Sequence, residues 1–226
     1  MSPLVKVVVL MLGLLPASRI KNVLLRRCGW RIGRGVSIAP IVAMGASSVV
    51  LEERSRIGAF NIIRGLVHLE LHAGARIGQW NWITAAAALV RAGAPASLIL
   101  AENSAVTSRH YIDASGGVSI GRFTTVAGVR STFITHGINW RLSAQSYRSI
   151  TIGEYCLISS NVNVAPGAQI ADQVVIGMGA TVSGILSEAG LYVAPRASLV
   201  KPALEGHYFS RDAGFISDVV RENGSL

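Results

Sequence analysis

The chain has 226 residues, of which 50% are hydrophobic and only 15% are charged, and its formal net charge is +9. Its length fits one domain with short appendages, and its low charge content predicts that a partner or a membrane covers part of its surface. The basic residues, almost all arginine, are scattered singly among apolar residues, which disfavours a nucleic-acid partner and leaves anionic small ligands or lipid surfaces open. Two cysteines, Cys28 and Cys156, are too few for a disulfide framework.

Residues 1–29 are predicted to form a hydrophobic and basic helical segment. The stretch PLVKVVVLMLGLLP (residues 3–16) is shorter than the roughly 20 apolar residues that span a bilayer, and its flanks do not resemble a cleaved signal peptide. Basic residues then alternate with apolar ones in residues 19–27. This pattern suits a helix on an anionic membrane surface, or a helix packed on the body or on a neighbouring subunit, and the sequence leaves both open.

A six-residue rhythm dominates residues 32–182. Its clearest run is the aliphatic column Ile152, Ile158, Val164, Ile170, Ile176 and Val182, followed four residues later, for the first five members, by Cys156, Val162, Ala168, Val174 and Ala180. Upstream the aliphatic column returns with phase slips as Ile32, Ile38, Met44, Val50; Ile57, Ile63, Leu69; Ile77, Ile83, Leu89; Leu100, Val106, Ile112, Val118; and Ile120, Val126.

A period of six fits a short strand plus a turn, repeated, and fits no α-helix. The chain is therefore predicted to coil into a parallel β-helix whose aliphatic residues point inward. Six Ile-Gly pairs mark the repeat, where glycine would supply a positive φ or a close backbone approach. We expect residues 30–198 to form the coil, with residues 1–29 and the tail 199–226 covering its ends.

The run ITIGEYCLISSNVNVAPGAQIADQVVIGMGATVSGIL (residues 150–186) resembles the hexapeptide-repeat acyltransferases, and LLRRCGWRIGRGVSIAP (residues 24–40) resembles the entry segment of those that O-acetylate sugars during polysaccharide assembly. The resemblance implies an all-β, left-handed parallel β-helix, a homotrimer with active sites between subunits, and acetyl-CoA as the donor to a sugar or lipid-linked saccharide. No metal is expected.

The rhythm breaks at STFITHGINW (residues 131–140), where the family carries a Thr-His or Ser-His pair before a loop that leaves the coil. The resemblance makes His136 the general base that removes a proton from the acceptor hydroxyl, a task for which imidazole is suited. Residues 137–149 are expected to form the loop, and Gly137 to give the chain freedom to leave the coil.

Other candidate site residues come from the same resemblance. Asp113 could hold the acceptor, orient His136 or only shape a turn, and Asn139 could fix the histidine tautomer or only belong to the loop. Ser160 could steady the oxyanion of the reacting thioester, or be a plain corner serine. Further expected contacts to acetyl-CoA are Gly177, Gly179 and Ala180 along its pantetheine arm, and Arg196 and Lys201 at its phosphates.

Two rival functions share the predicted scaffold. A γ-class carbonic anhydrase would need three zinc-binding histidines, but His68 and His72 lie only four apart in a strand-and-turn repeat, and the expected spacing is absent. A non-catalytic scaffold would not need His136 and its loop. The predicted location is cytoplasmic, with residues 1–27 in possible contact with the inner membrane face. The acceptor, the acyl chain length and the choice between O- and N-acylation stay open.

Overall fold

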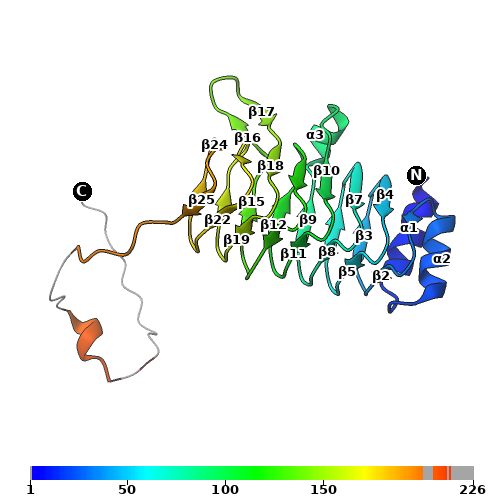
Figure 1. The fold of residues 1–226 in the computed structure, drawn as a ribbon, viewed down its shortest axis with the longest axis horizontal. Helices are drawn as coiled ribbons and strands as arrows, with labels where there is room; N and C mark the ends of the chain where they lie inside the picture. Colours follow the sequence, from blue (N-terminus) through cyan, green and yellow to red (C-terminus); the bar gives the residue numbers. More distant parts are fainter. Residues whose placement is uncertain (1, 201–205, 213, 215–226) are drawn as a thin grey trace. The chain divides into compact units, whose positions relative to one another are not determined.

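The computed structural model describes residues 2–200, 206–212 and 214. Contacts divide the chain into two compact units, residues 1–194 and residues 195–226. The first unit contains two N-terminal helices and a long coil of short strands, with a third, short helix on the coil (Figure 1). The described part of the second unit contains one short 3-10 helix, η1 (His207–Ser210).

Two capped helices begin the first unit and pack at the N-terminal end of the coil (Figure 1). Helix α1 (Pro3–Gly13) begins after Ser2, whose hydroxyl accepts from Val5 N, and helix α2 (Arg19–Arg27) begins after Ser18, whose hydroxyl accepts from Lys21 N. Among the described residues, neither these helices nor any other is long and apolar enough to cross a membrane.

Lys21 fastens these helices to the coil. Its side chain is only 1% exposed, and its Nζ donates to the carbonyl oxygens of Gly13 (2.9 Å), Leu15 (2.7 Å) and Ala39 (2.9 Å). Burial lowers the pKa of this amine to about 8, so it remains mostly protonated at pH 7. One cation therefore binds three carbonyl groups, of which only that of Gly13 has a second donor, Ile41 N at 2.8 Å.

The coil consists of three parallel sheets, and each turn of the chain adds one strand to each sheet. The first sheet contains β1 (Arg31–Ile32), β4 (Ser48–Leu51), β7 (His68–Leu71), β10 (Ser97–Leu100), β13 (Val118–Ile120), β18 (Ile150–Ile152), β21 (Gln169–Ile170) and β24 (Ile185–Leu186). The second contains β2 (Ser37–Ile38), β5 (Arg56–Ile57), β8 (Arg76–Ile77), β11 (Ala105–Val106), β14 (Thr125–Val126), β19 (Leu157–Ile158), β22 (Val174–Ile176) and β25 (Gly190–Tyr192). The third contains β3 (Val42–Met44), β6 (Ile62–Arg64), β9 (Trp82–Thr84), β12 (Tyr111–Asp113), β15 (Thr132–Phe133), β20 (Asn163–Val164) and β23 (Thr181–Val182). The predicted all-β, left-handed parallel β-helix is confirmed.

The aliphatic column forms the core as predicted. All of its members from Ile152 to Val182 are at most 3% exposed, and the smaller residues from Cys156 to Ala180 are buried beside them. Three upstream assignments were wrong. In the first strand of the third sheet the inward residue is Ala43, one position before the predicted Met44, which is 38% exposed. Val50 was also predicted to point inward, but its neighbours Val49 and Leu51 are the buried residues. Leu89 is buried outside the coil, in a helix that the rhythm did not predict.

The six Ile-Gly glycines serve the close approach of successive turns, and none has a positive φ. A Cβ added at Gly33, Gly58, Gly78, Gly121, Gly153 or Gly177 would approach an atom of the next turn to below 3.0 Å. A side chain there would therefore force two hydrogen-bonded turns apart. Several positive-φ corner positions are instead occupied by residues such as Phe60 and Tyr155.

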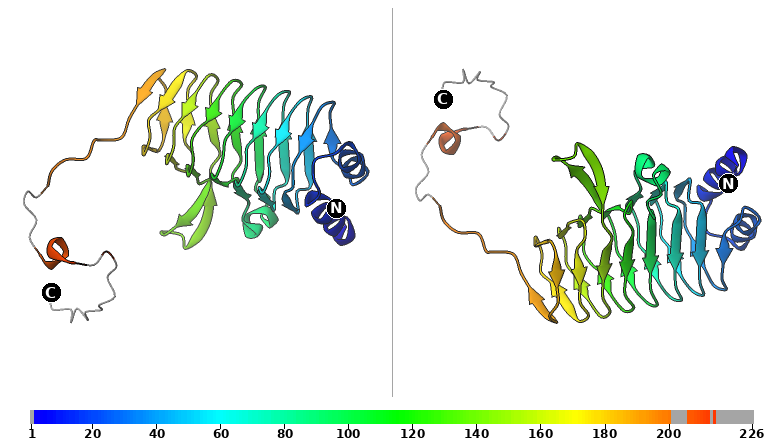
Figure 2. Two further views of the ribbon diagram at one scale, coloured as in Figure 1. Left: turned by 90° about the horizontal axis from the view of Figure 1, so that it is seen from below. Right: turned by 90° about the horizontal axis from the view of Figure 1, so that it is seen from above.

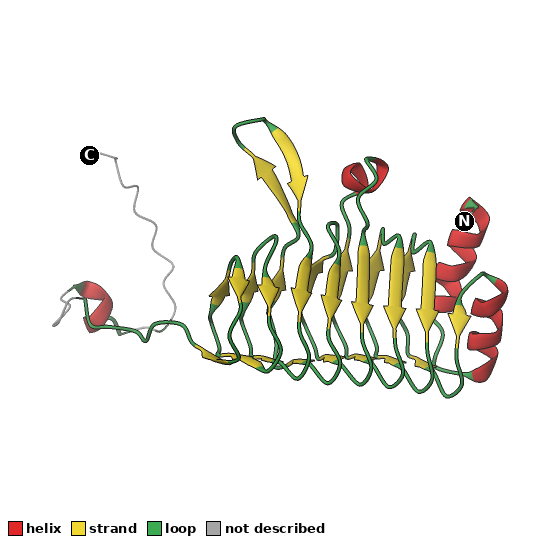
Figure 3. Ribbon diagram, turned by 45° about the horizontal axis from the view of Figure 1, so that its top comes forward, coloured by secondary structure: helices red, strands yellow, loops and turns green. Residues whose placement is uncertain are grey.

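Two excursions leave the coil at the same corner, between the third and first sheets (Figures 2 and 3). The first contains helix α3 (Ala87–Arg91), which follows β9. The second is an antiparallel hairpin of β16 (His136–Asn139) and β17 (Ala144–Tyr147), which follows β15. The interrupted rhythm near residue 136 therefore corresponds to a hairpin. Gly137 lies in β16, its φ is not positive, and an added Cβ would contact nothing within 4 Å, so the start of the hairpin does not require glycine.

Candidate active site

Asp113 and His136 meet at this corner. Strands β12 and β15 pair in parallel, with Ile112 beside Phe133. Asp113 follows Ile112 at the end of β12, and the chain turns out of the coil shortly after Phe133. His136 begins the hairpin, so its ring lies directly over Asp113, and the distance from His136 Nδ1 to Asp113 Oδ2 is 2.7 Å. Two residues far apart in sequence thus form a carboxylate–imidazole pair.

The Asp113 carboxylate is 1% exposed and is surrounded by donors. Its Oδ1 accepts from the backbone N (3.2 Å) and hydroxyl (2.5 Å) of Ser115. Its Oδ2 accepts from Thr135 N (2.8 Å), Thr135 Oγ1 (2.8 Å) and His136 N (3.0 Å), besides the imidazole. Ser115 also accepts from Ala86 N at 2.8 Å, which ties the excursion of α3 to the same cluster.

These bonds keep Asp113 ionised. Burial by itself raises the pKa of the carboxyl, but the hydrogen bonds from Ser115, His136 and Thr135 outweigh burial and lower its pKa below the usual value. An ionised carboxylate only accepts, so His136 Nδ1 carries the proton that it shares with Asp113. The other ring nitrogen, Nε2, has no hydrogen-bond partner among the described residues and is free to accept a proton.

A pocket of about 250 Å³ opens beside this pair, on the outer side of the third sheet. It is lined by Arg64, Trp82, Thr84, Ala85, Ala86, Tyr111, Asp113 and His136. The excursion of α3 begins at its alanines and the hairpin begins at its histidine, so the two excursions flank it. An imidazole with a free nitrogen at the edge of a pocket is the arrangement that general base catalysis needs.

The structure places two other predicted residues, Asn139 and Ser160, away from the ring of His136. Asn139 Oδ1 accepts from Arg141 N (3.1 Å) and Leu142 N (3.2 Å) in the hairpin turn, while Asp113 makes the bond to the His136 ring. Ser160 lies at the corner between the second and third sheets, where its hydroxyl accepts from Val129 N at 3.2 Å.

Three of the residues predicted to contact acetyl-CoA lie at another corner of the coil than His136. Gly177, Gly179 and the buried Ala180 share the corner of Ser160, one side of the coil away from the corner of His136. Arg196 is exposed and belongs to the second unit, and Lys201 lies outside the described residues.

Arg64, Trp82 and Tyr111 were not predicted from the sequence. They are the outward neighbours of the inward residues Ile63, Ile83 and Ile112, and strand pairing sets Ile62–Arg64, Trp82–Thr84 and Tyr111–Asp113 in one register. Counting outward from the buried column would have aligned them, but only with the length of the α3 excursion known.

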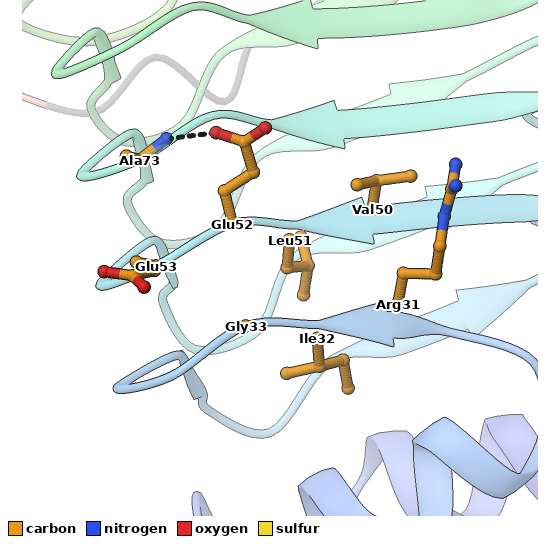
Figure 4. A pocket seen from close by; sticks show the side chains of 8 residues that line it. All are labelled: Arg31, Ile32, Gly33, Val50, Leu51, Glu52, Glu53 and Ala73. Carbon is orange, nitrogen blue, oxygen red and sulfur yellow. Dashed lines mark hydrogen bonds between the residues drawn. The ribbon is translucent and has the colours of Figure 1, made fainter.

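Another hollow, of about 440 Å³, lies on the first turns near the helices (Figure 4). Its side chains include Arg31, Glu52 and Glu53, and Glu52 Oε2 accepts from Ala73 N at 3.0 Å. Its lining residues contain neither a histidine nor a cysteine, so it offers a charged surface and no evident base or nucleophile.

Two other histidines, His110 and His68, have partners of their own. His110 is 2% exposed, its Nδ1 accepts from Ser131 N (3.1 Å), and its Nε2 lies 3.0 Å from Thr107 Oγ1. Burial lowers its pKa to about 4, so the ring is neutral and structural. His68 pairs with Glu70 on the first sheet at 2.9 Å. In the described part of the chain, no three His, Cys, Asp or Glu residues are grouped to hold a metal ion.

Comparison with known proteins places the repeat in a family. Residues 149–184 match the model of the bacterial transferase hexapeptide (six repeats), whereas no curated protein matches the chain. One solved structure, the polySia specific acetyltransferase NeuO, is 14% identical over 76% of this chain and 81% of its own, with a TM-score of 0.29, a likeness too low to support inference. Residues 149–184 therefore carry the hexapeptide repeats of the bacterial transferases, within the three-sheet coil.

Proposed function

We propose that the protein transfers an acetyl group from acetyl-CoA to a hydroxyl group of a sugar. The observation that carries this proposal is the pair formed by Asp113 and His136 at the edge of a pocket, with the histidine Nε2 free. A thioester is already activated, so the transfer needs a base and an ordered acceptor and no covalent enzyme intermediate.

In the proposed reaction, His136 Nε2 takes the proton of the acceptor hydroxyl as its oxygen attacks the thioester carbonyl carbon. The carbon–oxygen bond forms, the carbon–sulfur bond breaks, and the imidazolium returns its proton to the leaving thiolate. The products are the O-acetylated sugar and free CoA. Asp113, held by Ser115 and Thr135, orients the ring and stabilises the imidazolium, because its carboxylate is ionised and cannot turn away.

We also propose that the active form is a homotrimer in which acetyl-CoA lies between subunits. Within one chain His136 and the small residues Gly179 and Ala180 occupy different corners, so a cleft that contains both requires a second copy. The hairpin supports this arrangement, because Ile138, Trp140 and Leu142 are 78%, 78% and 74% exposed and offer apolar area to a neighbour. Light scattering on the purified protein tests the trimer.

The test of the reaction starts with calorimetry, which should give one acetyl-CoA bound per chain. A screen of sugars then follows CoA release with a thiol reagent, and transferred acetyl is identified by mass spectrometry. His136→Ala should abolish transfer while binding of acetyl-CoA persists. His72→Ala, which removes a half-exposed histidine on the first sheet, is the matched control and should leave both unchanged. Equal transfer by both variants would refute the assignment of His136.

The helices support a further proposal, that the protein contacts an anionic membrane surface. The apolar residues Leu4, Met11 and Ile20 are 73%, 61% and 73% exposed, and the nearby Arg19 and Arg27 are exposed as well. Apolar area beside arginine is typical of interfacial helices. The protein should float with vesicles that contain phosphatidylglycerol, and a Leu4→Glu/Met11→Glu variant should not. Flotation of this variant like the original protein would contradict the proposal.

A further inference from the structure

Arg64 occupies an unusual place in the pocket beside His136. It ends strand β6 and is exposed, and among the described residues no carboxylate or other side chain pairs with its guanidinium. The one acidic residue in the pocket lining, Asp113, is buried, and both of its oxygens are engaged by other donors. The pocket therefore presents an unneutralised cation whose five donors match a carboxylate or phosphate group.

Two aromatic rings also line the pocket, on the next two strands of the sheet after that of Arg64. Trp82 and Tyr111 face outward on neighbouring strands of the third sheet, in register with one another. They are 51% and 38% exposed, and their ring centroids are 6.5 Å apart at an interplanar angle of 51°. Exposed aromatic faces beside polar groups can bury the C–H face of a sugar ring, which turns its hydroxyls toward hydrogen-bonding partners.

The register of the strands sets the scale of this arrangement. Arg64 pairs with Thr84 on the next strand, and Thr84 pairs with Asp113 on the strand after that. Adjacent strands lie about 4.8 Å apart, so Arg64 is about 10 Å from the pair of Asp113 and His136 along the coil. This span accommodates a sugar with an anionic substituent at one end and a reacting hydroxyl at the other.

We infer that the acceptor is an anionic saccharide whose carboxylate or phosphate group is bound by Arg64 while the sugar packs on Trp82 and Tyr111. The position of the reacting hydroxyl rests on the proposed function; the recognition of the anion does not. Arg64 acts in binding, and its loss should weaken affinity for the acceptor without removing the base.

The test measures binding by NMR in the absence of acetyl-CoA, at low salt, with three probes: glucuronic acid, glucose 6-phosphate and glucose. At least one anionic probe should bind about tenfold or more tightly than glucose, as expected for a charge-assisted contact. Arg64→Gln should remove this preference, and Arg64→Lys should keep part of it. Arg56→Gln removes an exposed arginine from strand β5 on another sheet and should leave the preference unchanged.

Comparison of the two anionic probes shows which anion the site takes. Equal binding of all three probes, no binding of either anionic probe, or an undiminished preference in Arg64→Gln would overturn the inference. His136→Ala separates this result from the proposed reaction, because it removes the base and should keep the preference for the anionic probe over glucose. Arg64-dependent binding without any acetyl transfer would refute the reaction and leave the anion site standing.

Discussion

The substitution Asp113→Asn tests the buried carboxylate with almost no change in shape. The amide can keep its oxygen toward Thr135 and His136 only by turning its NH₂ group toward Ser115. Ser115 N then loses its acceptor, at about 1–3 kcal/mol for a buried donor, and the bonds to the remaining oxygen lose their charge. We expect a loss of about 3 kcal/mol in the free energy of unfolding, or a Tm lower by about 6–12 °C for a chain of this size.

The measurement is urea unfolding followed by circular dichroism, at neutral pH and again in acid. Because the pKa of Asp113 is lowered in the folded state, its contribution is present above the ordinary carboxyl pKa and disappears as pH falls through the folded value. The gap between the original protein and the variant should therefore close in acid. Asp172→Asn is the control: its exposed oxygen accepts one bond, from Glu154 N at 2.7 Å, which the amide oxygen retains. A gap below about 1 kcal/mol at neutral pH, or one that is the same in acid, would contradict this account of the cluster.

Three other predictions concern the coil and its helices. Gly58→Ala should destabilise the protein by several kcal/mol, because the added Cβ would collide with the carbonyl oxygen of Gly78, whereas Gly137→Ala should change the urea midpoint little. The pKa of His110 is about 4 in the folded protein against an ordinary 6.5, so between these values only the unfolded chain takes up the proton. The free energy of unfolding should therefore fall by about 3 kcal/mol as pH falls from 6.5 to 4. His110→Gln should lose this part of the pH dependence of the urea midpoint. Lys21→Met should leave the carbonyl groups of Leu15 and Ala39 without their donor and expose residues 1–29 to faster proteolysis, while circular dichroism of the coil persists; unchanged proteolysis would show that the lysine is dispensable.

The regular part of the fold was predictable because every turn repeats one solution. From Ile152 to Val182 paired residues are 18 apart, so a period of six places each inward residue correctly. The prediction failed at Met44, where one side of the coil is a residue shorter, and at Leu89, where the chain forms a helix instead of a turn. A local pattern cannot show either departure, because both depend on which residue the neighbouring turn pairs with.

The candidate site was predictable to a smaller extent. His136 stood out because the rhythm stops there, and Asp113 followed from resemblance to a family. Their contact depends on the pairing of β12 with β15, which the sequence does not state. Tyr111, Trp82 and Arg64 lie one, two and three turns before the turn of His136. The excursion of α3 separates Trp82 and Arg64 from it in sequence, so their convergence appears only in three dimensions.

Arg64, Thr84 and Asp113 share one register, so they lie at regular spacings along the pocket. Residues of this register lie at steps of about 4.8 Å from the pair of Asp113 and His136, because every turn of the coil advances by one strand spacing. A change of acceptor therefore need not reshape a loop: moving the arginine from residue 64 to residue 84 would bring the bound anion one step nearer to His136. In a scaffold of this kind, selectivity for acceptors of different length can evolve by exchanging single side chains between turns.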